Sequence, residues 1–449
     1  MKLLDSGLFD LINKCLFFVQ SKLDNIRQNS FILSNFDIFI FLSAASVYAA
    51  SACAETGIIG AIAAVFVLLT VLKTLITKGL KIELEACNFY FIVYLLICFM
   101  SNFTSSLPVQ SFYGFSKTLL FAAFYFAMCT FLKNSKNYIL PVFSVIGLLI
   151  ACESIIGIIQ NHSGVLSLAS WQDTSYVNPE HIISRAYGTL KPYNPNLFGG
   201  WLVSGIFSIA ALSAVCFVKK KMLPALLCAA AFLTGILCIF YTGCRGAYAA
   251  IIIMLLCLLA AMIKLNKKCS LAALGALFSG FAFIVLNKSI LHRLMSIFML
   301  RGDSSSSFRM NVYHSVIQMV KDNPIWGIGA GNKVFREIYG LYMLSGFDAL
   351  SAYCVFLEIA VESGIFALLA FLLFLGSLLK AGVEKIVSAG DKIEKIILFT
   401  AAVSIIGVMI HGAVDTVFFR PQVQFVFWTM AAAITALFGK DQETWQQAQ

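Results

Sequence analysis

The sequence has few charged residues for its length. Only 12% of its 449 residues are Asp, Glu, Lys or Arg, whereas 60% are hydrophobic, and the mean hydropathy is +0.88. A soluble chain of this size needs more polar surface than this composition supplies, so a soluble globular protein is excluded. The sequence therefore predicts an all-α, polytopic membrane protein.

Other signals are also missing. The thirteen cysteines include no C-x-x-C pair and no metal-like spacing with histidine, so we expect no metal site. The run WGIGAGN (Trp326 to Asn332) lacks the preceding strand of a nucleotide-binding loop, which argues against a nucleotide cofactor. Close backbone packing beneath this run is the simpler expectation, and a nest of glycine amides that binds an anion is the alternative.

Twelve hydrophobic segments are each long enough to cross a membrane as a helix. They are 31–54, 57–77, 88–106, 113–132, 139–160, 196–217, 222–241, 246–264, 270–287, 351–380, 393–414 and 418–438. Lysines recur at every second connection, which places these connections and both termini in the cytoplasm. We expect an amphipathic cytoplasmic segment over 1–30, a transmembrane domain over 31–438 and a cytoplasmic tail over 439–449.

Two outer connections are longer than the others, at about 161–195 and 288–350. The second contains one apolar stripe at helical spacing, made by Phe308, Val312, Val316, Met319 and Val320. This stripe predicts a short surface helix that ends before Pro324, because proline cannot continue a helix. Arg309 and Tyr313 share the adjacent face of this helix.

Arginine is distributed differently from lysine. Nineteen of the twenty-four lysines fall on the inner side of the predicted membrane domain. Seven of the eight arginines fall on the outer side: Arg185, Arg245, Arg293, Arg301, Arg309, Arg336 and Arg420. The positive-inside rule does not explain outer arginines, and the forked guanidinium matches phosphate or carboxylate. We therefore interpret the outer face as an anion-binding site.

Acidic side chains also occur near the outer ends of the spans. Glu358 and Glu362 lie four residues apart on one helical face, where an ionised carboxylate facing lipid would be costly, so we expect both to face the protein interior. They either line a site or pair with an arginine. His411 and Asp415 allow the same two interpretations.

Four motifs, taken in order, resemble one family. They are RAYGTLKPYNPN (Arg185 to Asn196), TGCRGAY (Thr242 to Tyr248), SSFRMNVY (Ser306 to Tyr313) with KDNPIWGIGAGN (Lys321 to Asn332), and SAYCVFLEIAVESG (Ser351 to Gly364). This order resembles the O-antigen ligase and polymerase superfamily over about 180 to 370. The wording RGDSSSSFRMNVY and LSAYCVFLEIAVE looks most like the branch described as inorganic carbon (bicarbonate) transporters.

The resemblance implies a GT-C-like membrane glycosyltransferase of the bacterial inner membrane. Such an enzyme moves a glycan from a polyprenyl-diphosphate carrier to an acceptor glycan or lipid on the outer face, with no metal or other cofactor and no nucleic acid. Matching the motifs gives Arg309 and Arg245 the role of stabilising the departing diphosphate. The candidate substrate-binding residues are Arg185, Asn194, Asn196, Tyr313, Glu358 and His314.

The sequence departs from the family at one position. Ligases carry a histidine just before the aromatic–leucine pair, and aligning that pair with Phe356-Leu357 places Tyr353 and Cys354 there instead. Tyrosine has a pKa near 10 and is a poor base at neutral pH. The base could come from Glu358, Glu362 or His314, so the catalytic candidates are Arg309, Arg245, Glu362 and Tyr353.

The alternative function is transport of a small anion such as bicarbonate, which the same arginines would bind at an outer vestibule. A transport path normally leaves polar groups near the bilayer midplane in several spans. Here the polar groups gather at the outer ends of the spans, which favours glycan transfer. The sequence leaves the oligomeric state open.

Overall fold

The chain forms helices throughout the part that the structure, a computed structural model, describes. This part comprises residues 14–23, 30–77, 86–163, 185–265, 275, 286 and 304–438. The main helices are α2 (Phe31–Ser34), α3 (Phe36–Cys53), α4 (Thr56–Ile76), α5 (Ala86–Thr104), α6 (Pro108–Asn134), α7 (Ile139–His162), α8 (Pro195–Val218), α9 (Met222–Tyr241), α10 (Arg245–Leu265), α13 (Ser304–Asp322), α14 (Asn332–Tyr339), α15 (Val355–Ser363), α16 (Ile365–Ser388), α17 (Lys392–Gly412) and α18 (Pro421–Phe438). Two single 3-10 turns, η1 (Lys136–Tyr138) and η3 (Val417–Phe419), join them.

Ten of the described helices are long and apolar enough to cross a membrane. They are α3 to α10, α16 and α17, and α18 is a shorter apolar helix. The prediction of an all-α, polytopic membrane protein is therefore confirmed. The predicted span 270–287 lies outside the described residues except for 275 and 286, as do 1–13 and 439–449, so the count of about twelve spans stays a prediction.

The predicted span over 351–380 is wrong in its extent. The chain there forms two helices, α15 and α16, which meet at Gly364 with a φ of 87°, a backbone conformation that favours glycine. A Cβ atom on this glycine would overlap the carbonyl oxygen of Ile325. The membrane-crossing helix is therefore Ile365–Ser388, and Glu358 and Glu362 lie on the separate helix α15.

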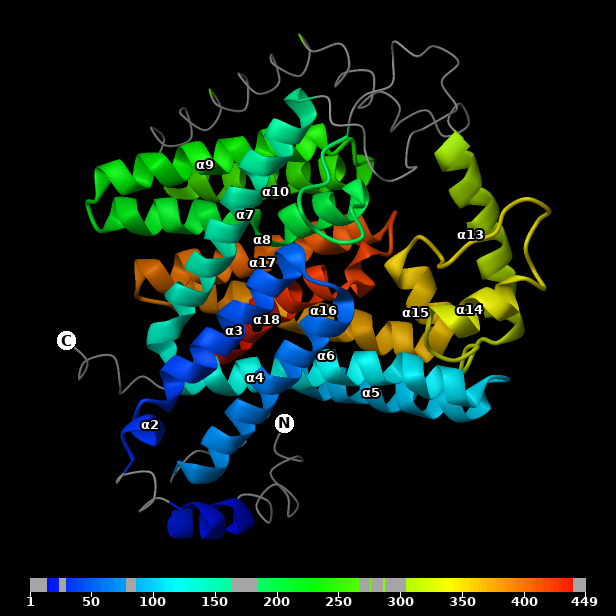
Figure 1. Cartoon of the computed structure of the whole chain (residues 1–449), viewed down its shortest axis with the longest axis horizontal. Helices are drawn as coiled ribbons and strands as arrows, with labels where there is room; N and C mark the ends of the chain where they lie inside the picture. Colours follow the sequence, from blue (N-terminus) through cyan, green and yellow to red (C-terminus); the bar gives the residue numbers. More distant parts are fainter. Residues whose placement is uncertain are drawn as a thin grey trace.

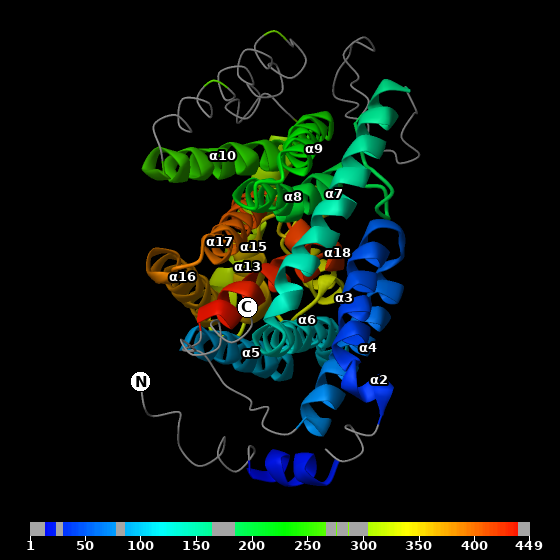
Figure 2. The ribbon, with the colours of Figure 1, turned by 90° about the vertical axis from the view of Figure 1, so that its left-hand side faces the viewer.

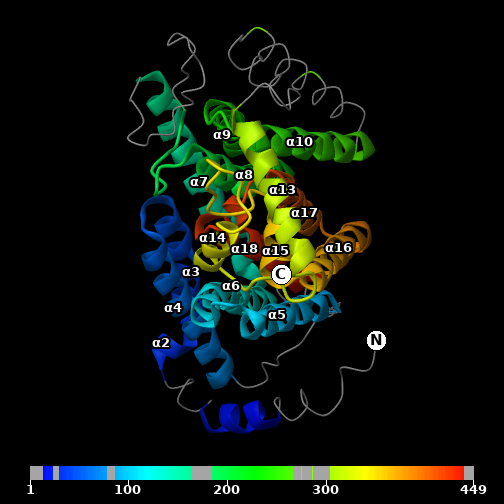
Figure 3. The same ribbon diagram turned by 90° about the vertical axis from the view of Figure 1, so that its right-hand side faces the viewer.

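Three helices of the second long loop and its end gather at one end of the bundle. Figure 1 shows α13, α14 and α15 together at the right of the view, beside the right-hand ends of α5 and α6. Seen from that end, they lie in front of α17 and α18 (Figure 3). We call this end the loop side; α3, α5, α7, α9 and α17 end there, and α4, α6, α8, α10, α16 and α18 begin there.

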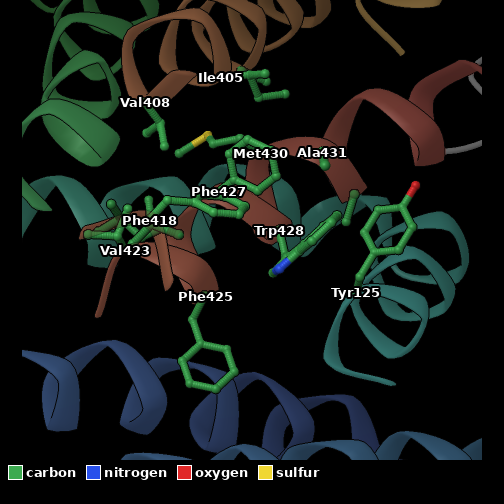
Figure 4. Close-up of a cluster of buried hydrophobic side chains, with 14 of the residues drawn as sticks. Tyr125, Ile405, Val408, Phe418, Val423, Phe425, Phe427, Trp428, Met430 and Ala431 are labelled. Atoms are coloured by element: carbon green, nitrogen blue, oxygen red, sulfur yellow. The ribbon is translucent and has the colours of Figure 1, made fainter. Parts of the chain in front are cut away.

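Helix α18 lies in the centre of the bundle. It contacts α3, α6, α8, α16 and α17, and Figure 2 shows it enclosed by these helices. Its aromatic side chains pack closely, with ring centroids of Trp428 and Tyr125 5.3 Å apart and those of Phe427 and Phe418 4.9 Å apart (Figure 4). Such close packing of rings gives a rigid base for the segment that precedes α18 at the loop side.

Helix α13 confirms the surface helix predicted within the second long loop. Val312, Val316 and Met319 are fully buried in a small separate core that also contains Phe335 and Tyr339 of α14. The helix ends at Asp322, two residues before the proline, as the pattern predicts. Its apolar stripe is therefore covered by α14 and α15, and the adjacent face carries Arg309.

Candidate functional site

Charged and polar side chains converge on Asp415, in the turn that follows α17 at the loop side. Its Oδ2 lies 3.5 Å from Nη2 of Arg309 on α13 and accepts a hydrogen bond of 3.2 Å from Nδ2 of Asn196 on α8. Its Oδ1 accepts the backbone N–H of Thr416 at 2.7 Å. The side chains of Asp415 and Arg309 keep 10% and 21% of their surface exposed, so a ligand at the surface can reach both.

Arg185 is joined to Asp415 through Asn196. Its Nη2 donates to Oδ1 of Asn196 at 2.7 Å, and its Nε donates to the carbonyl oxygen of Thr242 at 2.8 Å. The side chain of Asn196 therefore accepts a hydrogen bond from Arg185 and donates one to the carboxylate of Asp415, which Arg309 also contacts. This chain of contacts brings together Arg185 and Arg309, which are far apart in the sequence.

The side chain of Asn194 contacts backbone amides at the start of α8. Its side-chain oxygen accepts the backbone N–H groups of Asn196 and Leu197, which makes it the N-cap of α8. An N-cap residue satisfies amides that have no partner within the helix. The structure therefore gives the predicted substrate-binding residue Asn194 a contact within the protein, through which it fixes the start of the helix that carries Asn196.

The loop that carries Arg185 is anchored by two polar side chains of α7. The buried carboxylate of Glu153 accepts both the backbone N–H and the hydroxyl of Thr189, and Oε1 of Gln160 accepts the N–H of Gly188 at 2.9 Å. Sequence reasoning missed both residues. The available signal was a carboxylate inside an otherwise apolar segment, which is costly in a membrane unless it has partners.

Arg245 begins α10 where this helix meets the end of α17. The residue before it, Cys244, places its Sγ 3.3 Å from Nε2 of His411. A Cβ atom on the residue after it, Gly246, would overlap the imidazole ring of His411. The two helix ends are therefore in tight contact. Arg245 lies between two residues that meet His411, and His411 precedes Asp415 by four residues.

Two tyrosines lie beside the arginine of α13. Tyr313 donates its hydroxyl to the carbonyl oxygen of Tyr353 at 3.0 Å, and the guanidinium of Arg309 lies 6.0 Å from the ring centroid of Tyr353. Burial, with a smaller contribution from Asp415, raises the pKa of Tyr353, and burial raises the pKa of Tyr313 to about 12. Both phenols therefore stay protonated near neutral pH and act as hydrogen-bond donors or ring contacts, not as bases.

The two glutamates of α15 accept hydrogen bonds from backbone N–H groups. Glu358 is buried and accepts the N–H of Ala352, and Oε1 of the half-buried Glu362 accepts the N–H of Gly331 at 2.7 Å. Both face the protein interior, as expected. Their recorded partners are amides, so the interpretation that they pair with an arginine gains no support.

The glycine-rich run is packed against α15 and the α5–α6 turn. Five consecutive N–H groups have protein acceptors: Gly327 to Asn323 O, Ile328 to Val361 O, Gly329 to Glu362 O, Ala330 to Ser111 Oγ and Gly331 to Glu362 Oε1. A Cβ atom on Gly114 of α6 would overlap the carbonyl oxygen of Ala330. The expectation of close backbone packing is confirmed, and the nest interpretation is wrong because these amides already have partners.

Other candidates lie apart from Asp415 or outside the described residues. Arg336 forms an exposed pair with Asp348 at 3.3 Å, and Arg420 is exposed. His314 is exposed and lies five residues from Arg309, about 140° around the helix. Arg293 and Arg301 fall outside the described residues. Within the described ranges, no three His, Cys, Asp or Glu side chains are grouped as a metal site requires.

The protein-family comparison covers part of this site. Residues 229–372 match the O-antigen ligase family. This match, over about a third of the chain, confirms the resemblance to the O-antigen ligase superfamily and gives no support to the bicarbonate-transporter branch. The matched O-antigen ligase segment runs from α9 into α16 and contains Arg245 and Arg309, whereas Asn196 and Asp415 lie outside it. No curated protein matches the chain.

Proposed function

We propose that the protein transfers a glycan from a polyprenyl-diphosphate carrier to an acceptor glycan or lipid at its loop side. The O-antigen ligase segment supports a glycan-transferring membrane enzyme of the ligase or polymerase type. The observation that carries the site is the convergence of Arg309 and Arg185 on Asn196 and Asp415. Two helices and two loops supply these four side chains, so the tertiary structure builds the cluster.

The arginines suit the departure of a diphosphate. As the bond between the anomeric carbon and the diphosphate oxygen breaks, negative charge grows on that oxygen, and a positioned guanidinium stabilises it. One oxygen of the Asp415 carboxylate contacts Arg309 at 3.5 Å, a long contact with which a diphosphate can compete. Arg245 and Arg185 lie on segments that meet the same helix ends and supply further positive charge.

The side of the membrane follows from the lysines. At the ends opposite the loop side, the described chain carries Lys73, Lys133, Lys136, Lys219, Lys220, Lys221, Lys385 and Lys392. The positive-inside rule supports a cytoplasmic position for that face, and our proposal therefore has the loop side at the outer face of a bacterial inner membrane and both termini in the cytoplasm. The cluster then lies where the diphosphate of a membrane-embedded carrier meets water, as cell-envelope polysaccharide or lipopolysaccharide synthesis requires.

The test is the glycan profile of a deletion strain complemented with the wild type or with Arg309→Ala. Wild type should restore a surface glycan and remove its accumulated lipid-linked precursor. Arg309→Ala should fail to do so, because one lost charge-assisted contact in such a site costs about 2–4 kcal/mol of barrier.

Arg336→Ala is the matched control, since Arg336 also pairs with an aspartate on the loop side but is exposed and apart from Asp415. It should complement fully. Identical surface and lipid-linked glycans in the deletion strain and its parent would reject glycan transfer.

A further inference from the structure

Glycan transfer needs a group that accepts the proton of the acceptor hydroxyl, and the sequence candidates for this role have other contacts or lie on another face. Tyr353 keeps its proton near neutral pH. The carboxylates of Glu358 and Glu362 accept backbone N–H groups of Ala352 and Gly331 and hold loops in place. His314 is exposed on a different face of α13 from Arg309.

Asp415 has the geometry that these residues lack. Its carboxylate lies directly against the guanidinium of Arg309, and its side chain keeps 10% of its surface exposed. Thr416 N–H and the amide of Asn196 hold its two oxygens from the protein side. The carboxylate is therefore both oriented and reachable, next to the arginine assigned to the diphosphate.

We propose that Asp415 is the general base that accepts the acceptor's proton, and that donor binding prepares it by drawing Arg309 away. This inference rests on the proposed function. In the absence of donor, Nη2 of Arg309 lies 3.5 Å from Oδ2 of this carboxylate. A diphosphate that takes over the guanidinium removes this counter-charge, so the base is released only when the donor is present.

The step balances in atoms and charge. The acceptor oxygen forms a bond to the anomeric carbon, and the bond from that carbon to the diphosphate oxygen breaks with its electron pair remaining on the diphosphate. The hydroxyl proton moves to Oδ2 of Asp415 and passes to water after product release. Arg309, now on the diphosphate, stabilises the charge that forms there.

The surroundings of Asp415 fit this sequence of events. Arg309 approaches from α13 and is 21% exposed, whereas Asn196 on α8 accepts a hydrogen bond from Arg185, which is itself anchored to the carbonyl oxygen of Thr242. Beneath them, the Cys244–His411 contact locks α10 to α17. The partner that can leave Asp415 is therefore the more exposed arginine, and the partners on the protein side keep the carboxylate in place.

The test measures steady-state transfer by the full-length protein in liposomes, with a polyprenyl-diphosphate glycan as donor and the host's own acceptor. Asp415→Asn keeps the shape and removes the charge. We expect its kcat to fall by about 100-fold or more, the range of a lost general base, with no rise in the KM for donor. Asp348→Asn, which removes the carboxylate of the exposed Arg336 pair, should match the wild type.

A purely structural role of Asp415 predicts a change in the donor KM in place of a change in kcat. If Asp415 only positions Arg309, Asp415→Asn should raise the donor KM while kcat stays within about threefold of the wild type, and this result would overturn the proposal. Asp415→Glu keeps a carboxylate and should retain more turnover than Asp415→Asn. Glutamate turnover at or below that of the asparagine variant would equally overturn it, provided that both variants elute as the wild type does in gel filtration.

Failure of the base proposal and failure of the proposed function are distinguishable. If the wild type neither consumes donor nor forms product, glycan transfer itself is rejected. If the wild type transfers and Asp415→Asn keeps its kcat, only the role of Asp415 is rejected. As a second measurement, formate added to Asp415→Gly should restore transfer if the missing group is a base, and no restoration at any formate concentration counts against it.

Discussion

At the scale of single residues, the site consists of few groups with several contacts each. Asn196 accepts a hydrogen bond from Arg185 and donates one to Asp415, so its amide connects the guanidinium with the carboxylate. Neighbours in sequence have different tasks: Asn194 caps a helix, while Asn196 lies within the charged cluster. The residue types indicated an anion site, but only the contacts separate binding groups from supporting ones.

Arg185→Lys should lower the rate of transfer by about tenfold or more. A lysine has one ammonium group and cannot reach both the Thr242 carbonyl and Asn196 in the fork geometry of a guanidinium. Initial rates in liposomes measure the effect. Arg420→Lys, at an exposed arginine, is the control, and equal rates for the two variants would contradict the assigned role of Arg185.

Asn194→Ala should lower stability and leave substrate affinity unchanged. Loss of an N-cap costs about 1 kcal/mol, and Asn194→Asp, which keeps a capping oxygen, should behave as the wild type. Thermal unfolding of the detergent-solubilised protein and the donor KM give the two readouts. If Asn194→Ala raises the donor KM and leaves the stability unchanged, Asn194 contacts the substrate.

At the scale of elements, the loop side is held by close backbone contacts between helix ends. Hydrogen bonds from four consecutive amides, Ile328 to Gly331, tie the segment before α14 to α15 and to Ser111 of α6. Gly364 turns the chain between α15 and α16. These contacts place α13, and with it Arg309, against the ends of the membrane helices.

Gly114→Ala tests this packing. The added methyl group meets the backbone of Ala330 and Gly331, which cannot move aside as a flexible side chain would, so we expect a loss of about 1–3 kcal/mol of stability and reduced transfer. Gly376→Ala, in α16 with nothing within 4 Å of its Cβ, is the matched helix control and should be neutral or stabilising. Equal melting temperatures of the two variants would show that the contact is looser than described.

At the scale of the whole molecule, helices that alternate in direction bring α13, α14 and α15 together at one end. Arginines meet there, and most of the described lysines lie at the opposite ends. The proposed function requires donor lipid, acceptor and base to meet where membrane and water adjoin. The asymmetry of the fold thus matches the asymmetry of charge.

Reporter fusions test the predicted orientation. Alkaline phosphatase inserted after Gly340, in the exposed turn that follows α14, should be active, because that enzyme folds outside the cytoplasm. A green fluorescent protein fused after Gln449 should fluoresce, as it does in the cytoplasm. The reverse pattern would place the arginine cluster in the cytoplasm and exclude transfer at the outer face.

The sequence by itself determined the class of protein, most of the spans and the helix α13. Long apolar runs and helical periodicity are local properties, and in a membrane each backbone segment must satisfy its own hydrogen bonds, so these predictions hold without knowledge of the fold. The same is true of the four motifs, because their order in the chain carries the resemblance. Arg309 and Asn196 were among the residues it indicated.

The tertiary structure alone decided which groups meet. The break at Gly364 depends on the approach of the Ile325 backbone, and the fate of the glycine-rich amides depends on acceptors from α5–α6 and α15. The contact of Asp415 with Arg309 joins residues 106 positions apart in the chain. No local pattern encodes such a contact, because its energy comes from two side chains that only the packing of α8, α13 and α17 brings within reach.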